Sequence, residues 1–203
     1  RKYMFQFIES ICCINKQLRN LEFHQARFDR TRNDNFTEIN PILLEEIIKF
    51  PTDLTDEKYK VRIVYDREIQ SVEFLPYQMK SINSIQFFEI DPKINYTYKY
   101  SDRSFLDEFL KEAQTDDLVL IKSNYITDCT YSNLVFFDGE NWFTPRSVLL
   151  KGTMREALLQ SNQIRERNIK VSDLANFKSF KRINAMMNLA ESEEFDVSLL
   201  ISL

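Results

Sequence analysis

Apolar and polar residues alternate along the stretches 58–66, 69–79 and 84–90, and other stretches, such as 3–13, are rich in aromatic and β-branched side chains. Such alternation predicts β-strands, because successive side chains of a strand point to opposite faces of the sheet. The apolar run at 180–189 fits a strand or a helix, and we favour the strand. Strands are therefore expected at residues 3–13, 58–66, 69–79, 84–90, 96–102, 117–128, 132–139, 140–144 and 180–189.

A second set of segments has apolar residues three or four positions apart, which predicts helices. Asn20 is suited to cap the first of them, and Pro41 stands at the first helical position of the second, where its missing N–H is harmless. Ser101 or Asp102 is expected to cap the third. Helices are expected at residues 21–32, 42–50, 104–114 and 153–167, with a short helical turn at 172–177.

The best candidate for a boundary is the segment DPKIN at residues 91–95, where the pattern of the chain changes. Mixed helices and strands on both sides of it predict the α+β class. We expect a small N-terminal α+β lobe over residues 1–90 and a larger C-terminal lobe over residues 91–203.

Composition narrows the class of protein further. Hydrophobic residues make up 43% and charged residues 29%, as in ordinary soluble domains. The formal net charge of −4 argues against a nucleic-acid partner. Three cysteines without framework spacing argue against a disulfide-stapled secreted domain, and a single histidine leaves no metal site of the usual spacing. No apolar run reaches the roughly 18 residues of a membrane helix. Polar residues interrupt the first apolar run, so no signal peptide is expected and a cytoplasmic location is the default.

Gly152 and Thr153 precede a predicted helix, whose unpaired N–H groups and dipole suit a phosphate group. Thr153 and Glu156 also have the spacing of a capping box, which accounts for the same residues structurally. The sequence pattern leaves both interpretations open.

His24 and Arg27 lie three positions apart and share one helix face. Arginine is the natural bidentate partner of a phosphate group, but Arg27, Arg30 and Arg32 could equally form a solvated helix face. His24 is more simply explained as a hydrogen-bonded, partly buried imidazole than as a catalyst.

Lys99 stands among three tyrosines, and strand alternation places Tyr96, Tyr98 and Tyr100 on the face opposite to it. A partly desolvated lysine has a lowered pKa and can form a Schiff base, whereas an edge-strand lysine with its amine in water is the commoner case. Asp128, at the end of a predicted strand, is either a turn residue or a partner for a cofactor cation.

Taken in order, four segments resemble the class IV aminotransferase family, which comprises pyridoxal-phosphate enzymes of fold type IV. They are FIESICCINKQLRNLEFHQARFDRTR, YKYSDRS, ITDCTYSNLVFFDGENWFTP with LLKGTMREALL, and KRINAMMNL. The third is the most specific, because its acidic residue, SN pair, DG hairpin, TP pair and Gly-Thr helix start follow the family's order. The resemblance covers residues 7–187 and is closest to short aminodeoxychorismate-lyase-like members. It implies two small α/β lobes of the D-amino acid aminotransferase-like kind, with the cofactor cleft between them.

This resemblance also implies roles for single residues. Lys99 would be the catalytic lysine that holds pyridoxal 5'-phosphate, and Asp128 the carboxylate that faces its pyridine nitrogen, where most members have Glu. Arg27, Gly152, Thr153 and Met154 would bind the phosphate. The remaining matches are Asn184 on the phosphate, Leu150 packed on the ring, Thr130 and Arg103 near the ring, and Arg62 and Arg103 toward the substrate.

The implied reaction acts on a small-molecule amine. The short relatives favour a lyase that forms 4-aminobenzoate and pyruvate from 4-amino-4-deoxychorismate. A branched-chain or D-amino acid aminotransferase is the alternative, and a non-catalytic protein on the same scaffold is a third. A homodimer is expected by resemblance, with no nucleic-acid, membrane or metal partner.

Overall fold

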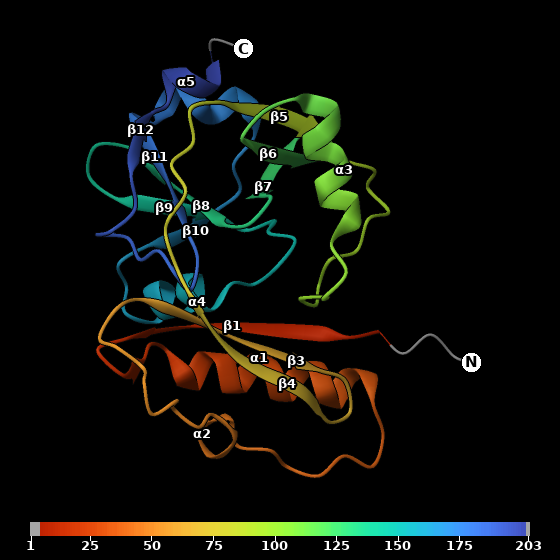
Figure 1. Cartoon of the computed structure of the whole chain (residues 1–203). Helices are drawn as coiled ribbons and strands as arrows, with labels where there is room; N and C mark the ends of the chain where they lie inside the picture. Colours follow the sequence, from red (N-terminus) through yellow and green to blue (C-terminus); the bar gives the residue numbers. More distant parts are fainter. Residues whose placement is uncertain (1–4, 202–203) are drawn as a thin grey trace. The chain divides into compact units, whose positions relative to one another are not determined.

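A computed structural model describes residues 5–201 of the chain (Figure 1). These residues form two compact units. The first comprises residues up to 79 together with 98–102, and the second comprises 80–97 and the residues from 103 onward. The strand at 85–89, which the sequence assigns to the first lobe, therefore lies in the second unit. The division of the chain into lobes at 1–90 and 91–203 stays a prediction.

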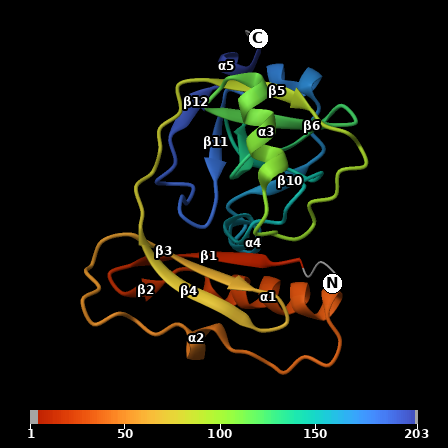
Figure 2. The same ribbon diagram turned by 45° about the vertical axis from the view of Figure 1, so that its right-hand side comes forward.

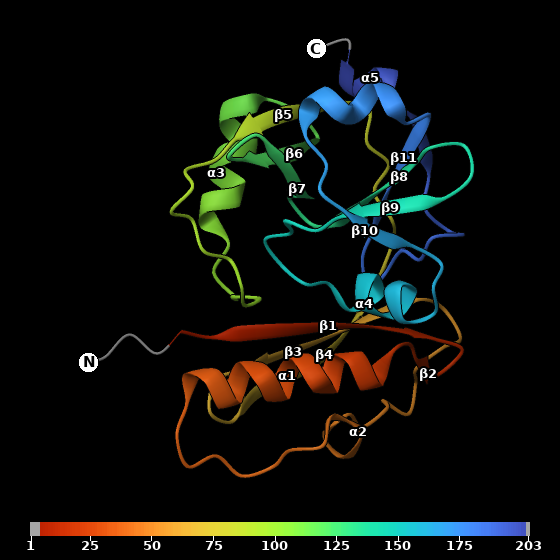
Figure 3. The same ribbon diagram turned by 180° about the vertical axis from the view of Figure 1, so that it is seen from behind.

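In the first unit, an antiparallel sheet of order β2-β1-β3-β4 is covered on one face by helix α1 (Figures 1 and 3). Side chains alternate along β1, so Phe7 and Ile11 point toward α1 and pack with Phe28 in the core of this unit. The elements are β1 (Phe7–Ile14), β2 (Gln17–Leu18), α1 (Leu21–Asn35), α2 (Leu44–Ile47), β3 (Tyr59–Tyr65) and β4 (Ile69–Pro76).

The buried face of α1 carries the two residues singled out from the sequence. His24, Arg27, Phe28 and Thr31 recur at helical spacing and are all buried. Arg32 is buried as well, so the solvated-face interpretation is wrong for Arg27 and Arg32 and holds only for the exposed Arg30. These guanidinium groups stay inside the unit because protein acceptors replace water around them.

Two details of this unit differ from the sequence-based expectation. Asn20 occupies the N-cap position of α1, but in the left-handed conformation (φ 54°) and without a side-chain capping bond. The predicted helix 42–50 is reduced to α2, with Pro41 three residues ahead of it. Gln25 of α1 binds the start of this segment, because its side chain donates to the Ile42 carbonyl at 2.9 Å and accepts from the Leu44 N–H at 2.8 Å.

The segment around Lys99 runs beside β1 in place of the expected regular strand 96–102. The Ile8 N–H donates to the Lys99 carbonyl at 2.9 Å, and Tyr100 bridges Phe7. The three tyrosines do not share one face, because Tyr98 and Tyr100 pack on Phe7 whereas Tyr96 packs on the ring of Phe105.

In the second unit an eight-stranded sheet has the order β10-β9-β8-β7-β6-β5, with β11 added to β8 and β12 to β11 (Figures 1 and 2). Helix α3 connects the parallel pair β5 and β6 and lies against β5 (Figure 2). The strands are β5 (Ile85–Glu89), β6 (Asp117–Lys122), β7 (Tyr125–Cys129), β8 (Asn133–Phe137), β9 (Trp142–Pro145), β10 (Arg165–Arg167), β11 (Ser179–Ile183) and β12 (Glu194–Asp196). The helices are α3 (Ser104–Ala113), α4 (Thr153–Gln160), the 3-10 helix η1 (Val171–Asn176) and α5 (Ser198–Ile201).

Helix α4 is shorter than the predicted 153–167. It ends in a Schellman motif, in which Asn162 takes the left-handed conformation (φ 56°) and the Gln163 N–H donates to the Leu158 carbonyl at 2.9 Å. The chain then forms β10, parallel to β9. At the other end Gly152, not Thr153, is the N-cap, and no side chain caps the helix, so the predicted capping box is wrong.

Two further predictions concern the ends of a helix and of a strand, and a third concerns membrane-spanning helices. Arg103 is the N-cap of α3 in place of Ser101 or Asp102, again without a side-chain bond. The run 180–189 is a strand only as far as Ile183. No helix among residues 5–201 is long and apolar enough to cross a membrane.

Candidate functional site

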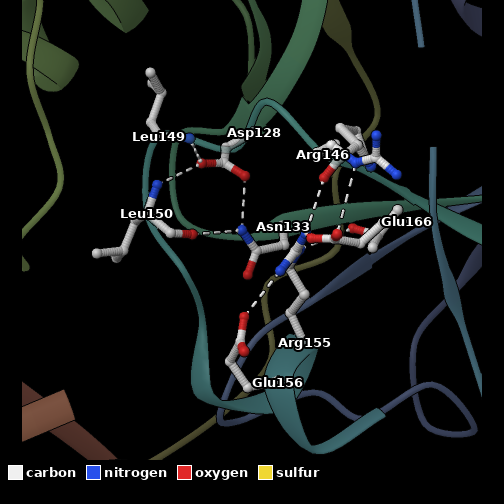
Figure 4. Close-up of polar contacts among 10 residues, drawn as sticks. Asp128, Asn133, Arg146, Leu149, Leu150, Arg155, Glu156 and Glu166 are labelled. Atoms are coloured by element: carbon white, nitrogen blue, oxygen red, sulfur yellow. Dashed lines mark hydrogen bonds and ion pairs between the residues drawn. The ribbon is translucent and has the colours of Figure 1, made fainter. Parts of the chain in front are cut away.

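Asp128 and Asn133 form a cross-strand pair at the end of the β7–β8 hairpin, directly opposite each other. Both side chains are buried, and the Asn133 Nδ2 donates to the Asp128 Oδ1 at 2.6 Å (Figure 4). Asp128 is thus not the turn residue that its position suggested, because it lies inside β7 and faces a partner on β8.

The loop that leads from β9 to α4 returns to this pair. The backbone N–H groups of Leu149 and Leu150 donate to the Asp128 Oδ2 at 2.8 and 3.0 Å (Figure 4). The Asn133 Nδ2 also donates to the Leu150 carbonyl at 2.9 Å. These three hydrogen bonds therefore fix the loop to the hairpin.

All three donors to Asp128 are neutral groups. A carboxylate offers about four lone-pair sites, so three bonds leave one site, on Oδ1. Burial raises the pKa of Asp128 to about 6, although the three hydrogen bonds and the charge of Arg155 act in the opposite direction. A cation beside the open site would lower this pKa and keep the carboxylate ionised.

Gly152 is explained by its close approach to Asn133. Its φ of −72° is accessible to any residue, so no left-handed backbone requires the glycine. A Cβ at this position would lie 2.0 Å from the Asn133 Oδ1. The missing side chain thus makes room for the amide that holds Asp128.

Helix α4 starts immediately after Gly152. The side chain of Met154 is buried and packs with Val135, Leu158 and Ile183, so it belongs to the core. An anion at this helix start would meet backbone N–H groups and the positive end of the helix dipole.

Arg155 holds the first turn of α4 in place from inside the unit. Its side chain is 1% exposed and donates to Glu156 at 2.8 Å and to Glu166 of β10 at 2.6 Å (Figure 4). It also bonds the Thr144 hydroxyl and the Pro145 carbonyl of β9. The helix start is therefore anchored to two strands.

Thr130, Arg103 and Asn184 are brought together around the turn 129–132. Arg103 donates to the Thr130 carbonyl and lies 4.3 Å over the ring of Tyr131, while Asn184 donates to the Tyr131 carbonyl at 3.1 Å. The Thr130 N–H and hydroxyl both donate to Asp117, which also accepts from Arg182 at 2.9 Å. This network fixes the turn that follows Asp128.

In the first unit, the buried carboxylate of Glu9 contacts both His24 and Arg27 of the α1 face. Arg27 donates to it through Nε at 2.8 Å and Nη2 at 2.5 Å, and the His24 Nδ1 lies 2.6 Å from Oε2. Burial alone would raise the pKa of Glu9, but the charge and hydrogen bonds of Arg27, with those of His24, lower it to about 2. Two of the five N–H groups of Arg27 are therefore oriented by Glu9.

Lys99 is half-buried, not fully in water, and it acts electrostatically on His24. Burial lowers the pKa of His24, and the charges of Arg27 and Lys99 lower it further against the opposing effect of Glu9. The imidazole is thus buried and hydrogen-bonded to Glu9, as the simpler interpretation of His24 expected.

Arg62 lies on β3 opposite Ser10 and pairs with Glu73 of β4 at 3.3 Å. Both side chains are partly exposed, at 33% and 49%. Its partner is therefore a carboxylate of this chain, on the sheet surface.

Sequence reasoning missed four residues that position the predicted ones: Glu9, Asp117, Asn133 and Arg155. Asn133 appeared only as part of the SN pair in the resemblance. Its position could have identified it. Only four residues separate Asp128 from Asn133, which fits a tight turn, so the two residues are expected to face each other across a hairpin. Glu9 carried a weaker signal, a charge at an inward position of a strand.

Comparisons with known proteins agree with this arrangement. Residues 6–192 match the family described as Amino-transferase class IV. An uncharacterized protein of Haemophilus influenzae is 35% identical over 189 residues, which span 92% of this chain and 100% of that protein.

Solved structures extend the likeness to the fold. The structure of a candidate 4-amino-4-deoxychorismate lyase from Haemophilus somnus 129pt is 30% identical, covers 93% of this chain and 100% of its own, and gives a TM-score of 0.85. A hypothetical aminotransferase from Mycobacterium tuberculosis in its PLP-bound form is 14% identical, with a TM-score of 0.77 over 95% of this chain and 80% of its own. The branched-chain amino acid aminotransferase of Escherichia coli is 13% identical, with a TM-score of 0.69 over 95% and 76%.

These findings confirm the α+β fold of type IV that the resemblance implied. The match spans most of the described residues, including Lys99, Asp128 and the start of α4. The chain belongs to the class IV aminotransferase family, a family of pyridoxal-phosphate-dependent aminotransferases and lyases.

Proposed function

We propose that this chain is a pyridoxal-phosphate lyase that splits 4-amino-4-deoxychorismate into 4-aminobenzoate and pyruvate. In this proposal Lys99 holds the cofactor covalently and Asp128 faces its pyridine nitrogen. The other cofactor-binding residues are Arg27, Thr130, Leu150, Gly152, Thr153, Met154 and Asn184, and the substrate residues are Arg62 and Arg103.

The state of Asp128 is the observation that carries the proposal. A carboxylate that is buried among neutral N–H donors, with one lone-pair site open and a pKa raised to about 6, lacks a close cation. A protonated pyridine nitrogen supplies that positive charge and also donates a hydrogen bond. The donor set around Asp128 therefore fits the cofactor.

The groups proposed for the phosphate fit an anion. The start of the eight-residue helix α4 offers backbone N–H groups, and Arg155 fixes its first turn. In the first unit, Glu9 orients Arg27 through one edge of its guanidinium. Met154 contributes its backbone only, because its side chain packs in the core.

Two considerations favour the lyase over other class IV reactions. The 30% identical structure from Haemophilus somnus 129pt, which this chain covers in full, is a candidate 4-amino-4-deoxychorismate lyase. The reaction also needs no co-reactant, because all atoms of the substrate are divided between the two products.

The bound cofactor would withdraw electrons from the substrate carbon that carries the amine. Lys99, as a free amine, would take the proton from that carbon and return it to the departing pyruvate unit. Arg62 and Arg103 are the candidates for holding substrate carboxylates, since a guanidinium binds a carboxylate in a bidentate manner. Arg103 is the better placed of the two, because its guanidinium lies beside the turn that follows Asp128.

A transaminase acting on branched-chain or D-amino acids is the second candidate. The name of the matched family favours it, and both reactions use the same lysine and carboxylate. Formation of the pyridoxamine form after an amino acid is added, without formation of 4-aminobenzoate, would select it over the lyase.

The test begins with the purified protein and pyridoxal phosphate. We expect an absorbance band of the bound cofactor, and borohydride should fix it to the peptide that contains Lys99. Freshly generated 4-amino-4-deoxychorismate should then yield 4-aminobenzoate and pyruvate in equal amounts. Cofactor uptake without product refutes the lyase, and absence of both uptake and adduct supports a non-catalytic protein.

Resemblance to the family also supports a homodimer. Light scattering coupled to size-exclusion chromatography measures this directly. A mass near twice the 24.3 kDa of the chain is expected. A single-chain mass at micromolar concentration would refute it.

A further inference from the structure

We propose that Asn133 is a positioning residue whose single amide sets both the carboxylate Asp128 and the turn that leads into α4. This inference rests on the proposed function, because it assigns the ring-nitrogen end and the phosphate end of the cofactor site to the same support.

Both polar atoms of the Asn133 side chain have a close neighbour. Its two N–H groups donate to the Asp128 Oδ1 at 2.6 Å and to the Leu150 carbonyl at 2.9 Å (Figure 4). Its Oδ1 fills the space that a Cβ of Gly152 would occupy. The residue is only 5% exposed, so water does not compete for these contacts.

The orientation of the amide follows from chemistry. Both neighbours of Nδ2 are oxygen acceptors, so a flipped amide would place oxygen against oxygen at two contacts at once. Asn133 therefore has one stable orientation, and that orientation determines which Asp128 oxygen keeps an open lone pair.

A residue that merely fills space makes a different prediction from one that orients Asp128. Asn133→Asp keeps the size of the side chain but replaces the donor by an acceptor. Two carboxylates at 2.6 Å cannot both be ionised, so the pair would retain a proton that the wild-type site releases. Asn133→Ala and Asn133→Ser remove the amide without adding charge, and Ser keeps one donor.

The exposed Asn168 of the same unit provides the matched control. Each variant is first compared with wild type by circular dichroism. The carboxyl carbon of Asp128 is then titrated by carbon-13 NMR in the cofactor-free protein, and pyridoxal phosphate is added in an absorbance titration at pH 7.

We expect the pKa of Asp128 to lie near 6 in wild type and in Asn168→Ala, and to rise in all three Asn133 variants, most in Asn133→Asp. Affinity for pyridoxal phosphate should fall by roughly tenfold or more in Asn133→Ala, as expected when a hydrogen bond to a charged group is lost. Asn133→Ser should lie between Ala and wild type.

If folded Asn133→Ala and Asn133→Ser titrate and bind cofactor as wild type does, the inference is overturned. If Asn133→Asp does not fold, the two uncharged variants decide the question. Failure of the proposed function is a separate result: wild type would then bind no cofactor, while the titration of Asp128 would still report whether Asn133 controls it.

Discussion

Substituting Gly152 by Ala tests the packing of the candidate site without any ligand. The new Cβ would lie 2.0 Å from the Asn133 Oδ1 and 3.2 Å from its Cγ, and no other side chain comes as close. Because the backbone of Gly152 (φ −72°, ψ 143°) suits alanine, no backbone strain adds to this contact. The whole change in the free energy of unfolding should therefore come from the contact with Asn133.

The cost can be bounded from the contacts of that neighbour. Overpacking in a buried site costs about 1–3 kcal/mol. Alternatively Asn133 swings away and loses its bond to the Asp128 carboxylate, and a hydrogen bond to a charged group contributes about 1.5–3 kcal/mol. By either route, Gly152→Ala should destabilise the protein by about 2 kcal/mol.

A double-mutant cycle isolates the contact. Asn133→Ala removes the Oδ1 and the Cγ, so the double variant should be more stable than the sum of the two single effects predicts, by about 1–3 kcal/mol. Urea unfolding of the cofactor-free protein provides the four free energies, and a second cycle with Asn168→Ala should be additive. Additivity within about 0.5 kcal/mol in the Asn133 cycle would refute the reasoning. Gly152 would then have to be explained by approach of the phosphate, and its substitution would weaken cofactor binding alone.

Three further variants address Lys99 and the buried carboxylates Glu9 and Asp128. Lys99→Ala should abolish the borohydride-fixed cofactor adduct, whereas the exposed Lys111→Ala should retain it; mass spectrometry of the digested protein distinguishes the two results. The pKa of Glu9 is lowered to about 2, so its stabilising effect is present above pH 4.5 and is lost as pH falls toward 2. Glu9→Gln should flatten that acid limb of the unfolding profile and cost about 3 kcal/mol at pH 7, because it leaves Arg27 buried without its counter-charge; an unchanged profile would contradict the pairing. The pKa of Asp128 is raised from 3.8 to about 6, so its contribution is present below pH 3.8 and is lost as pH rises through 6. Asp128→Asn should remove this dependence and weaken cofactor binding, and a variant that binds as tightly as wild type would contradict the assigned role.

Local patterns predicted most of the strands, some from alternation of apolar and polar residues and others from aromatic and β-branched residues. Strand β1 belongs to the second kind, because Phe7, Ile8, Ile11 and Cys12 are buried on both of its faces. Helical spacing predicted a helix at residues 21–32, and α1 (Leu21–Asn35) confirms it, with His24, Phe28 and Thr31 on its buried face. These elements depend on contacts that recur at a fixed sequence interval, which a single sequence displays.

Helix lengths and caps were predicted less well, since they depend on partners distant in the sequence. The helix expected at 42–50 starts only at Leu44, where Gln25 of another helix binds the backbone of Ile42 and Leu44. The end of α4 was in principle visible, because Asn162 is a residue type that tolerates the left-handed conformation of a Schellman motif.

The candidate site residues were predicted through resemblance, and the residues that position them appear only in three dimensions. Asp128 and Arg27 each appeared ambiguous in the sequence, as a turn residue and as part of a solvated face. The structure resolves both ambiguities. Asp128 is buried against Asn133, and Arg27 is buried against Glu9. The contacts of Glu9 with Arg27 and of Asn133 with Gly152 determine how the candidate site residues are oriented, and no spacing rule in the sequence connects either pair.

A comparison of Glu9 with Asp128, both buried, shows why Asp128 and not Glu9 is suited to a cationic ligand. Glu9 already has a guanidinium against both of its oxygens, and its pKa of about 2 leaves it ionised at any physiological pH. Asp128 has as many hydrogen bonds, but its donors are an amide and two backbone N–H groups, and its pKa is about 6. Neutral dipoles stabilise a buried negative charge only in part, so the approach of a cation gains far more free energy at Asp128 than at Glu9. Because Asn133 leaves one lone pair of Asp128 open, that gain is available to a single donor in one direction, as a ring nitrogen carrying one proton requires.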